Sequence, residues 1–143
     1  MSDAILFDIH GDVAQITINK PQKRNALALA DLTAIIGHLK TAEATDIRAL
    51  VITGAGDRAF SAGVDLSDVS ETEDWGENPL TALCDAVQNF PRPTIARLNG
   101  AVIGGAAELS LPCDLRVGVE GMKLRVPPAR PGIHHEPSGP RPA

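Results

Sequence analysis

The sequence lacks features that several classes of protein need. It has no tyrosine and only 3% aromatic residues, so it offers few platforms on which nucleic-acid bases could stack. Its 13 Lys and Arg residues against 18 Asp and Glu residues give a formal net charge of −5, which disfavours nucleic acid or an anionic membrane surface as a partner. No apolar run approaches the roughly 18 residues that a membrane-spanning helix needs. We therefore expect neither a nucleic acid nor a membrane as a partner.

Cysteine is also scarce. Cys84 and Cys113 form no CxxC pair, and the N-terminus lacks the basic segment and long apolar stretch of a signal peptide. Both observations favour a reducing, cytoplasmic setting. What the sequence does contain is the composition of one globular domain, with 143 residues, 43% of them hydrophobic and 22% charged.

The apolar pattern predicts an α/β fold. Two runs rich in β-branched residues, 4–9 and 13–18, flank a short turn and predict a hairpin. Asn25 is expected to cap the helix that follows, and the near-continuous apolar run 47–53 is typical of a parallel strand covered on both faces. The order ββαβ(α)βαβ favours helices on a largely parallel sheet. The expected helices cover 26–40, 79–90 and 106–111, and the further strands cover 93–99 and 114–119.

The C-terminal segment has a different composition. Residues 127–143 hold six of the eleven prolines, which excludes a regular helix or a central strand. We predict a core over 1–126 and an irregular tail over 127–143. A sheet without a covering C-terminal layer would expose apolar surface, so we expect a homo-oligomer. His134, His135 and Glu136 in the tail do not make a full ligand set, so we expect no metal.

A short glycine motif follows the strand at 47–53. Gly54, Gly56 and Ala59 match the spacing of a dinucleotide-binding fingerprint. That fingerprint also needs a long helix opening at the second glycine and an acidic residue ending the next strand. Neither is predicted here, so a turn that ends a strand is the better interpretation, and an NAD-binding protein is the weaker hypothesis.

Two further segments of small residues can approach a ligand closely. Residues 59–66 read Ala-Phe-Ser-Ala-Gly-Val-Asp-Leu, but Ser61 is no nucleophile elbow because no glycine stands two places before it. Gly104 and Gly105 open the predicted helix 106–111, where free N–H groups can hold a developing oxyanion. Glu108 lies one turn into that helix on the same side, where a carboxylate can transfer a proton. Close helix packing with Glu108 in solvent is the alternative for this segment alone.

Together and in this order, these segments resemble the crotonase family of enoyl-CoA hydratases and isomerases. The resemblance runs from about Ile5 to Val126. It implies an α/β fold of ββα units with flanking helices, here without the family's C-terminal helical part. The motifs that carry it are Asn19-Lys20-Pro21 with Lys23-Arg24-Asn25-Ala26-Leu27, then residues 60–66, 93–100, 104–109 and 113–116.

The resemblance implies an activity and a site. Family members hold the thioester oxygen of an acyl-CoA with two backbone N–H groups, which correspond here to Val64 and Gly105, and stabilise an enolate. Glu108 matches a catalytic glutamate of the hydratases. The implied partner is an acyl-CoA or enoyl-CoA thioester of fatty acid metabolism, with no cofactor because CoA is part of the substrate, in a trimer or hexamer. The residues that match segments lining the CoA path are Arg24, Ala26, Ala62, Gly63, Asp65, Leu66 and Gly104.

The chain departs from the family in two ways. Hydratases carry a second glutamate in a segment resembling 123–128, and counting from Glu108 places it at Pro128, which cannot titrate. Losing one of two acid–base partners costs about 10²–10⁴-fold in rate. Family members are also longer, and this chain matches their N-terminal half. A hydratase or isomerase is therefore the first hypothesis, and a non-catalytic acyl-CoA-binding or assembly subunit is the second.

Overall fold

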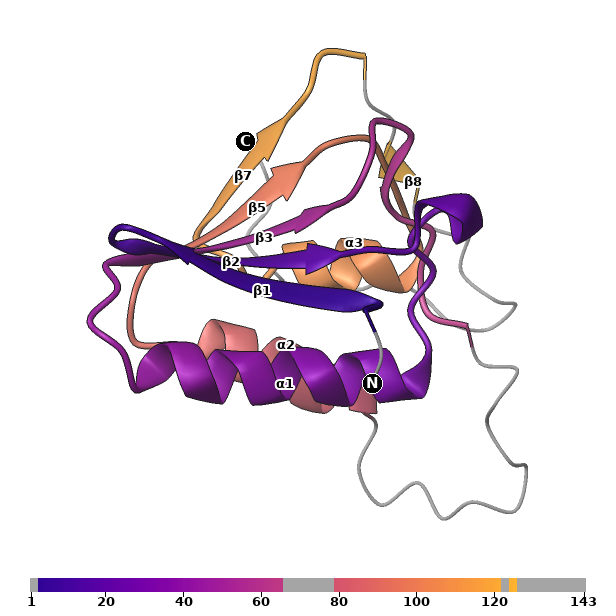
Figure 1. The fold of residues 1–143 in the computed structure, drawn as a ribbon. Coiled ribbons are helices and arrows are strands. Elements are labelled where there is room, and N and C mark those ends of the chain that lie inside the picture. The colour runs from indigo at the N-terminus through magenta and orange to yellow at the C-terminus, as the bar shows by residue number, and fades with distance from the viewer. Residues whose placement is uncertain (1–2, 66–78, 122–123, 126–143) are drawn as a thin grey trace, which may run out of the picture.

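The computed structural model describes residues 3–65, 79–121 and 124–125, and its strands form two sheets (Figure 1). The large sheet has the order β1-β2-β3-β5-β7, and β1 alone runs antiparallel to its neighbour. Its strands are β1 (Ile5–His10), β2 (Val13–Ile18), β3 (Ala49–Gly54), β5 (Thr94–Leu98) and β7 (Leu115–Gly118). The small sheet holds the parallel strands β4 (Ala59–Ser61), β6 (Ala101–Ile103) and β8 (Leu124–Arg125).

Helices cover one face of the large sheet. α1 (Leu29–Glu43) and α2 (Pro79–Gln88) lie side by side below it in Figure 1, and α3 (Gly105–Ser110) packs against α2. The predicted apolar face of α1 is confirmed, because Leu32, Ile35 and Leu39 are buried. No helix in the described part of the chain has the length and apolar character needed to cross a bilayer.

The architecture repeats one unit three times. Each helix leads into a strand of the large sheet and then directly into a strand of the small sheet, as α1–β3–β4, α2–β5–β6 and α3–β7–β8. Because β3, β5 and β7 are parallel, their carboxyl ends share one edge of the large sheet. The small sheet and the turns around it therefore gather at that edge, where ligands of open α/β sheets usually bind.

The start of α1 differs from the prediction that Asn25 caps it. The helix begins at Leu29, and the carboxylate of Asp31 accepts the Ala28 N–H at 2.7 Å. The same oxygen of Asp31 lies 2.8 Å from Lys20 Nζ. Asn25 is fully buried before the helix with φ +59°, and its side-chain NH2 group donates to the carbonyls of Ala55 and Ala59. The prediction was wrong because the side-chain oxygen of Asn25, the atom that would cap a helix, accepts the Lys20 N–H at 2.8 Å instead.

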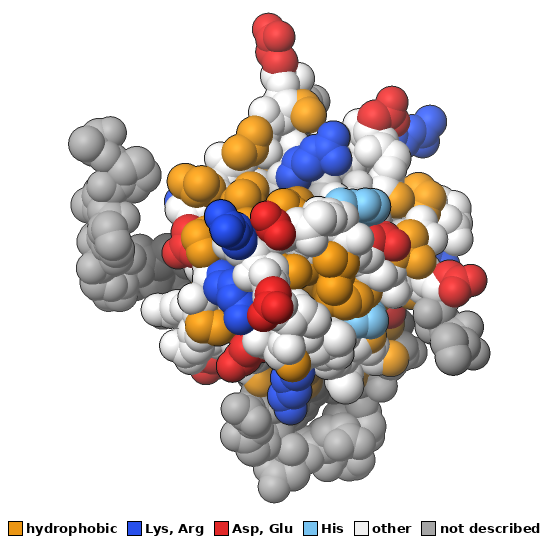
Figure 2. All heavy atoms as spheres, turned by 60° about the vertical axis from the view of Figure 1, so that its left-hand side comes forward, with side chains coloured by type: hydrophobic (Ala, Val, Ile, Leu, Met, Phe, Trp, Pro, Cys, Tyr) orange, Lys and Arg blue, Asp and Glu red, His pale blue; other side chains and the backbone are white. Residues whose placement is uncertain are grey.

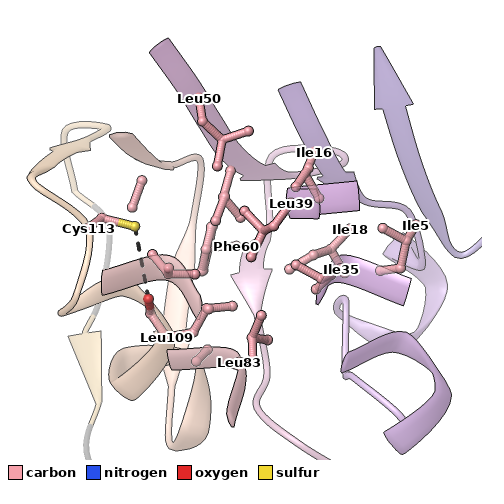
Figure 3. Packing of buried hydrophobic residues seen from close by; sticks show 14 of the residues in the cluster. Ile5, Ile16, Ile18, Ile35, Leu39, Leu50, Phe60, Leu83, Leu109 and Cys113 are labelled. Atoms are coloured by element: carbon pink, nitrogen blue, oxygen red, sulfur yellow. Dashed lines mark hydrogen bonds between the residues drawn. The ribbon is translucent and has the colours of Figure 1, made fainter. Parts of the chain in front are cut away.

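The core lies between the large sheet and the helices. Phe60 of β4 is fully buried at its centre, with Leu50 from the sheet, Leu39 from α1 and Leu109 from α3 around it (Figure 3). Truncating a buried phenylalanine typically costs about 3–5 kcal/mol. Phe60 therefore anchors the chain immediately before the residues that form the candidate site.

The other face of the large sheet is open within the described residues. The run 47–53 was expected to be covered on both faces, but Val51 is only half-buried. Val51, Ile95 and Leu115 follow one another across β3, β5 and β7 on the face away from the helices. In Figure 2, hydrophobic side chains also gather in the upper part of the view, the region in which Figure 1 places β7. Leu115 and Val117 are each 57% exposed.

Candidate active site

The segment that follows β4 is held against the loop before α1. Arg24 O accepts the N–H of Ala62 at 2.9 Å. Leu27 then donates to Gly63 O at 2.8 Å, and Leu27 O accepts the N–H of Asp65 at 2.6 Å. This pattern is a short parallel ladder in which Leu27 faces Val64. It leaves the Val64 N–H pointing away from the ladder, because only alternate N–H groups bond to one neighbouring strand.

The start of α3 meets this segment. Gly104 precedes the helix with φ 60° and ψ −125°, a conformation that glycine tolerates and other residues rarely adopt. A methyl group added at Gly63 would lie 3.6 Å from the Gly105 nitrogen. One added at Gly105 would lie 3.1 Å from Val64 Cγ2. The two glycine-bearing turns, far apart in sequence, are therefore in contact.

Two backbone donors at this contact have no hydrogen-bond acceptor in the part of the chain that the structure describes. No hydrogen bond between described residues uses the N–H of Val64 or that of Gly105. Both residues are only partly buried, so a ligand can reach them. Gly105 is also the first residue of a helix, where N–H groups lack intrahelical acceptors. Adjacent unpaired amides of this kind can bind an oxygen that gains negative charge.

Glu108 is the one residue of α3 that is exposed to solvent, since the structure buries the four residues around it. It follows Gly104 by one helical turn and so lies on the same side of the helix. Its backbone oxygen accepts the Cys84 thiol at 3.4 Å, which links α3 to α2. A carboxylate in this position can exchange protons with water and with a ligand held at the turn.

The thiol of Cys84 is not a nucleophile at neutral pH. Burial raises the pKa of Cys84 to about 11, and the negative charges of Glu108 and Asp85 raise it as well. A thiol needs a lowered pKa to attack a substrate. Of the titratable groups near Gly105, the carboxylate of Glu108 is therefore the better proton carrier.

The predicted CoA-lining residues fall into adjacent segments. Ala26, Ala62, Gly63 and Gly104 belong to the ladder and the turn described above, and Asp65 is exposed just beyond them. Leu66 and Pro128 lie outside the described residues, as does the predicted boundary at 126/127.

Arg24 also borders a pocket. It has φ 53°, is exposed, and lines a pocket of about 300 Å³ together with Gln22, Asp57 and Arg58. The structure thus places one basic side chain of the predicted CoA path beside a second arginine.

A buried polar network supports the site, and the sequence analysis missed it. The side-chain amide of Asn25 donates to Ala59 O at 2.8 Å, and that of Asn99 donates to the same oxygen at 3.0 Å. The hydroxyl of Ser61 donates to Asn25 O at 2.8 Å. The only available signal was that asparagine and serine in loops often bond to the backbone.

The glycine motif after β3 does not open a helix. Gly54 ends β3, a turn follows, and the chain enters β4 at Ala59. This agrees with the interpretation of a strand-ending turn and disfavours a dinucleotide site. Among the described residues, no three His, Cys, Asp or Glu side chains cluster as metal ligands do.

Known proteins share both the sequence and the fold. A sequence model of the enoyl-CoA hydratase/isomerase family matches residues 8–136. The chain belongs to this family. The family protein YngF of Bacillus subtilis is 38% identical over 138 residues, which cover 89% of this chain and 51% of that protein. The short-chain-enoyl-CoA hydratase of Clostridium acetobutylicum is 29% identical over 136 residues, covering 90% and 51%.

Solved structures agree with this family assignment. An enoyl-CoA hydratase from Bacillus anthracis superimposes with a TM-score of 0.74 at 32% identity, covering 85% of this chain and 50% of that one. The crotonase fold predicted for this enoyl-CoA hydratase/isomerase family member is therefore confirmed. The chain spans about half the length of the relatives that it matches.

Proposed function

We propose that this protein acts on acyl-CoA thioesters by polarising the thioester carbonyl between the N–H groups of Val64 and Gly105. The observation that carries the proposal is the contact between the two glycine-bearing turns, with both donors unused by the described residues. Each such donor typically lowers the barrier by about 3–4 kcal/mol. Membership of the enoyl-CoA hydratase/isomerase family supports the thioester as the substrate class.

In the proposed hydration of an enoyl-CoA, a water oxygen bonds to the β-carbon while the carbon–carbon π electrons move toward the carbonyl oxygen, which accepts both backbone hydrogen bonds as the enolate forms. Glu108 accepts the proton that the water loses and returns it to the α-carbon, because it lies on the same side of α3 as Gly104 and is open to solvent. The reaction needs no separate cofactor, since CoA is part of the substrate. The free thiols of Cys84 and Cys113 support a reducing compartment, and we place the protein in the cytoplasm.

Turnover of crotonyl-CoA by the unmodified protein and by Glu108→Gln tests this role. We expect the substitution to lower the rate about 10²–10⁴-fold, because glutamine keeps the shape of glutamate but cannot exchange a proton. Glu43→Gln is the matched control, since Glu43 is an exposed glutamate at the far end of α1. Equal rates for Glu108→Gln and the control would remove Glu108 from the mechanism.

The second candidate is a non-catalytic acyl-CoA-binding subunit, and Pro128 favours it because hydratases have a second glutamate there. Calorimetry with crotonyl-CoA separates the two candidates when it is combined with the rate assay. Binding without turnover supports the non-catalytic subunit, and the absence of binding contradicts both.

We further propose that the protein forms a homo-oligomer through the open face near β7, a trimer or hexamer as in the family. The support is the exposed apolar surface along β7, where Leu115 and Val117 are each 57% exposed, and Val119 just after the strand is 46% exposed. Such surface is usually covered by a partner.

A further inference from the structure

A single hydroxyl connects the two segments that set the position of the Val64 amide. Ser61 Oγ donates to Asn25 O at 2.8 Å and accepts the N–H of Gly63 at 3.0 Å. Ser61 and Asn25 are fully buried. The hydroxyl therefore joins the loop before α1 to the residue immediately before Val64, with both of its bonds sheltered from water.

Asn25 itself is fixed from several directions. Its φ of +59° follows the φ of +53° at Arg24, and two consecutive non-glycine residues in this region are strained. Its side-chain oxygen accepts the Lys20 N–H at 2.8 Å, while its amide donates to Ala55 O at 3.0 Å and to Ala59 O at 2.8 Å. These bonds hold the carbonyl of Asn25 in the one direction that meets Ser61 Oγ.

We infer that Ser61 and Asn25 are positioning residues that hold the Val64 N–H in the direction needed to bind a thioester oxygen. The inference rests on the proposed function. It adds the buried hydrogen bonds that keep one of the two N–H donors in position before a ligand binds. Gly63 has φ +107° and no side chain to restrict its backbone angles, so the hydrogen bonds of its N–H and its carbonyl are what fix its conformation. Removing the hydroxyl unties the Gly63 N–H, so the bond from the Leu27 N–H to Gly63 O at 2.8 Å is then the one remaining hydrogen bond among the described residues that orients the peptide carrying the Val64 N–H, and that peptide is held less firmly.

The test uses 4-(dimethylamino)cinnamoyl-CoA, whose absorption moves to longer wavelength when its thioester carbonyl is polarised. The unmodified protein is expected to shift the band, and Ser61→Ala is expected to lose at least half of the shift. Ser61→Cys keeps a weaker donor and acceptor, so its band shift is expected to lie between those of the unmodified protein and Ser61→Ala. Turnover of crotonyl-CoA should fall about tenfold in Ser61→Ala, the effect of one hydrogen bond.

Two controls separate positioning from folding. Thr94→Val removes another buried hydroxyl, which accepts the Asp114 N–H at 3.0 Å at the amino end of β5, and should leave the band shift unchanged. Affinity for free CoA, which has no thioester oxygen, should stay within about twofold in every variant.

Asn25→Gly is a second test of the positioning role. Glycine tolerates φ +59° and removes the side chain, so this variant should also lose the band shift.

The outcomes distinguish this inference from the proposed function. A full band shift in folded Ser61→Ala, or in Asn25→Gly, would overturn the positioning role and leave the two-donor site intact. No band shift in the unmodified protein, despite binding of the probe, would overturn the two-donor site itself and the positioning role with it.

Discussion

Individual glycines set how closely the chain around β4 approaches the end of β3 and the start of β6. A methyl group on Gly100 would lie 2.5 Å from the carbonyl carbon of Arg58, and one on Gly54 would lie 2.4 Å from Phe60 O. These neighbours are backbone atoms of the turn before β4 and of β4 itself, so they cannot rotate away as the end of a side chain can. The two positions thus accept only glycine for reasons of space and not of backbone angle.

We predict that Gly100→Ala lowers the free energy of unfolding by about 2–3 kcal/mol, because the added methyl must push β4 away from the start of β6. Gly37→Ala is the control. Gly37 lies inside α1 with no atom within 4 Å of the added methyl, so this change should raise stability by about 0.5–1 kcal/mol. Urea unfolding measures both, and equal stability of the two variants would contradict the packing argument.

For individual residues, the two glycine-bearing turns could be predicted from the sequence, but the buried side chains that hold them in place could not. Val64 and Gly105 were selected through local motifs and the family resemblance, and the structure brings their turns into contact. Asn25 was misjudged as a helix cap. The two carbonyls that its side-chain NH2 group binds, those of Ala55 and Ala59, lie 30 and 34 residues away, and no local pattern encodes contacts at such separations.

Among the elements, those with a clear apolar period were predictable. The hairpin, α1, α2 and the strands β3, β5 and β7 are confirmed, with ends that move by a few residues. The small sheet was missed entirely. Its strands have three, three and two residues, too few for an alternating pattern, and they exist because partners from distant units pair with them.

The connection between α3 and β7 carries a pH-sensitive group. Burial raises the pKa of the Cys113 thiol to about 11, while the Thr94 hydroxyl and Arg116 partly oppose that rise. The folded state thus favours the protonated thiol. The contribution of this thiol to the free energy of unfolding is fully present below pH 9, the pKa of the thiol in the unfolded chain, and is lost as the pH rises through 11.

We predict that the free energy of unfolding falls between pH 9 and 11, with about 2–3 kcal/mol of the loss due to Cys113. Urea titrations of the unmodified protein and of Cys113→Ala across this range isolate the contribution, because lysines and other groups titrate equally in both. The slope should be shallower in Cys113→Ala, and parallel curves would exclude a buried thiol at this position.

For the whole molecule, the decisive feature is the unequal covering of the large sheet. Helices bury one face, whereas Val51, Ile95 and Leu115 form an apolar row across the other. β7 is also an edge strand, and its four residues are all exposed. An edge strand beside exposed apolar side chains is a site at which another chain can pair. The sequence predicted exposed apolar surface but not its location, which depends on the strand order.

We predict that the protein sediments as an oligomer and that Val117→Lys shifts it toward the monomer. The lysine places a charge on a side chain that is 57% exposed on the open face, where burial against a second copy would then be costly. Ile9→Lys is the matched control, because Ile9 is 44% exposed but lies on β1 at the opposite edge of the same sheet. Sedimentation velocity should separate Val117→Lys from both the control and the unmodified protein. A monomer for the unmodified protein, or dissociation by Ile9→Lys but not by Val117→Lys, would place the contact elsewhere and contradict an interface at β7.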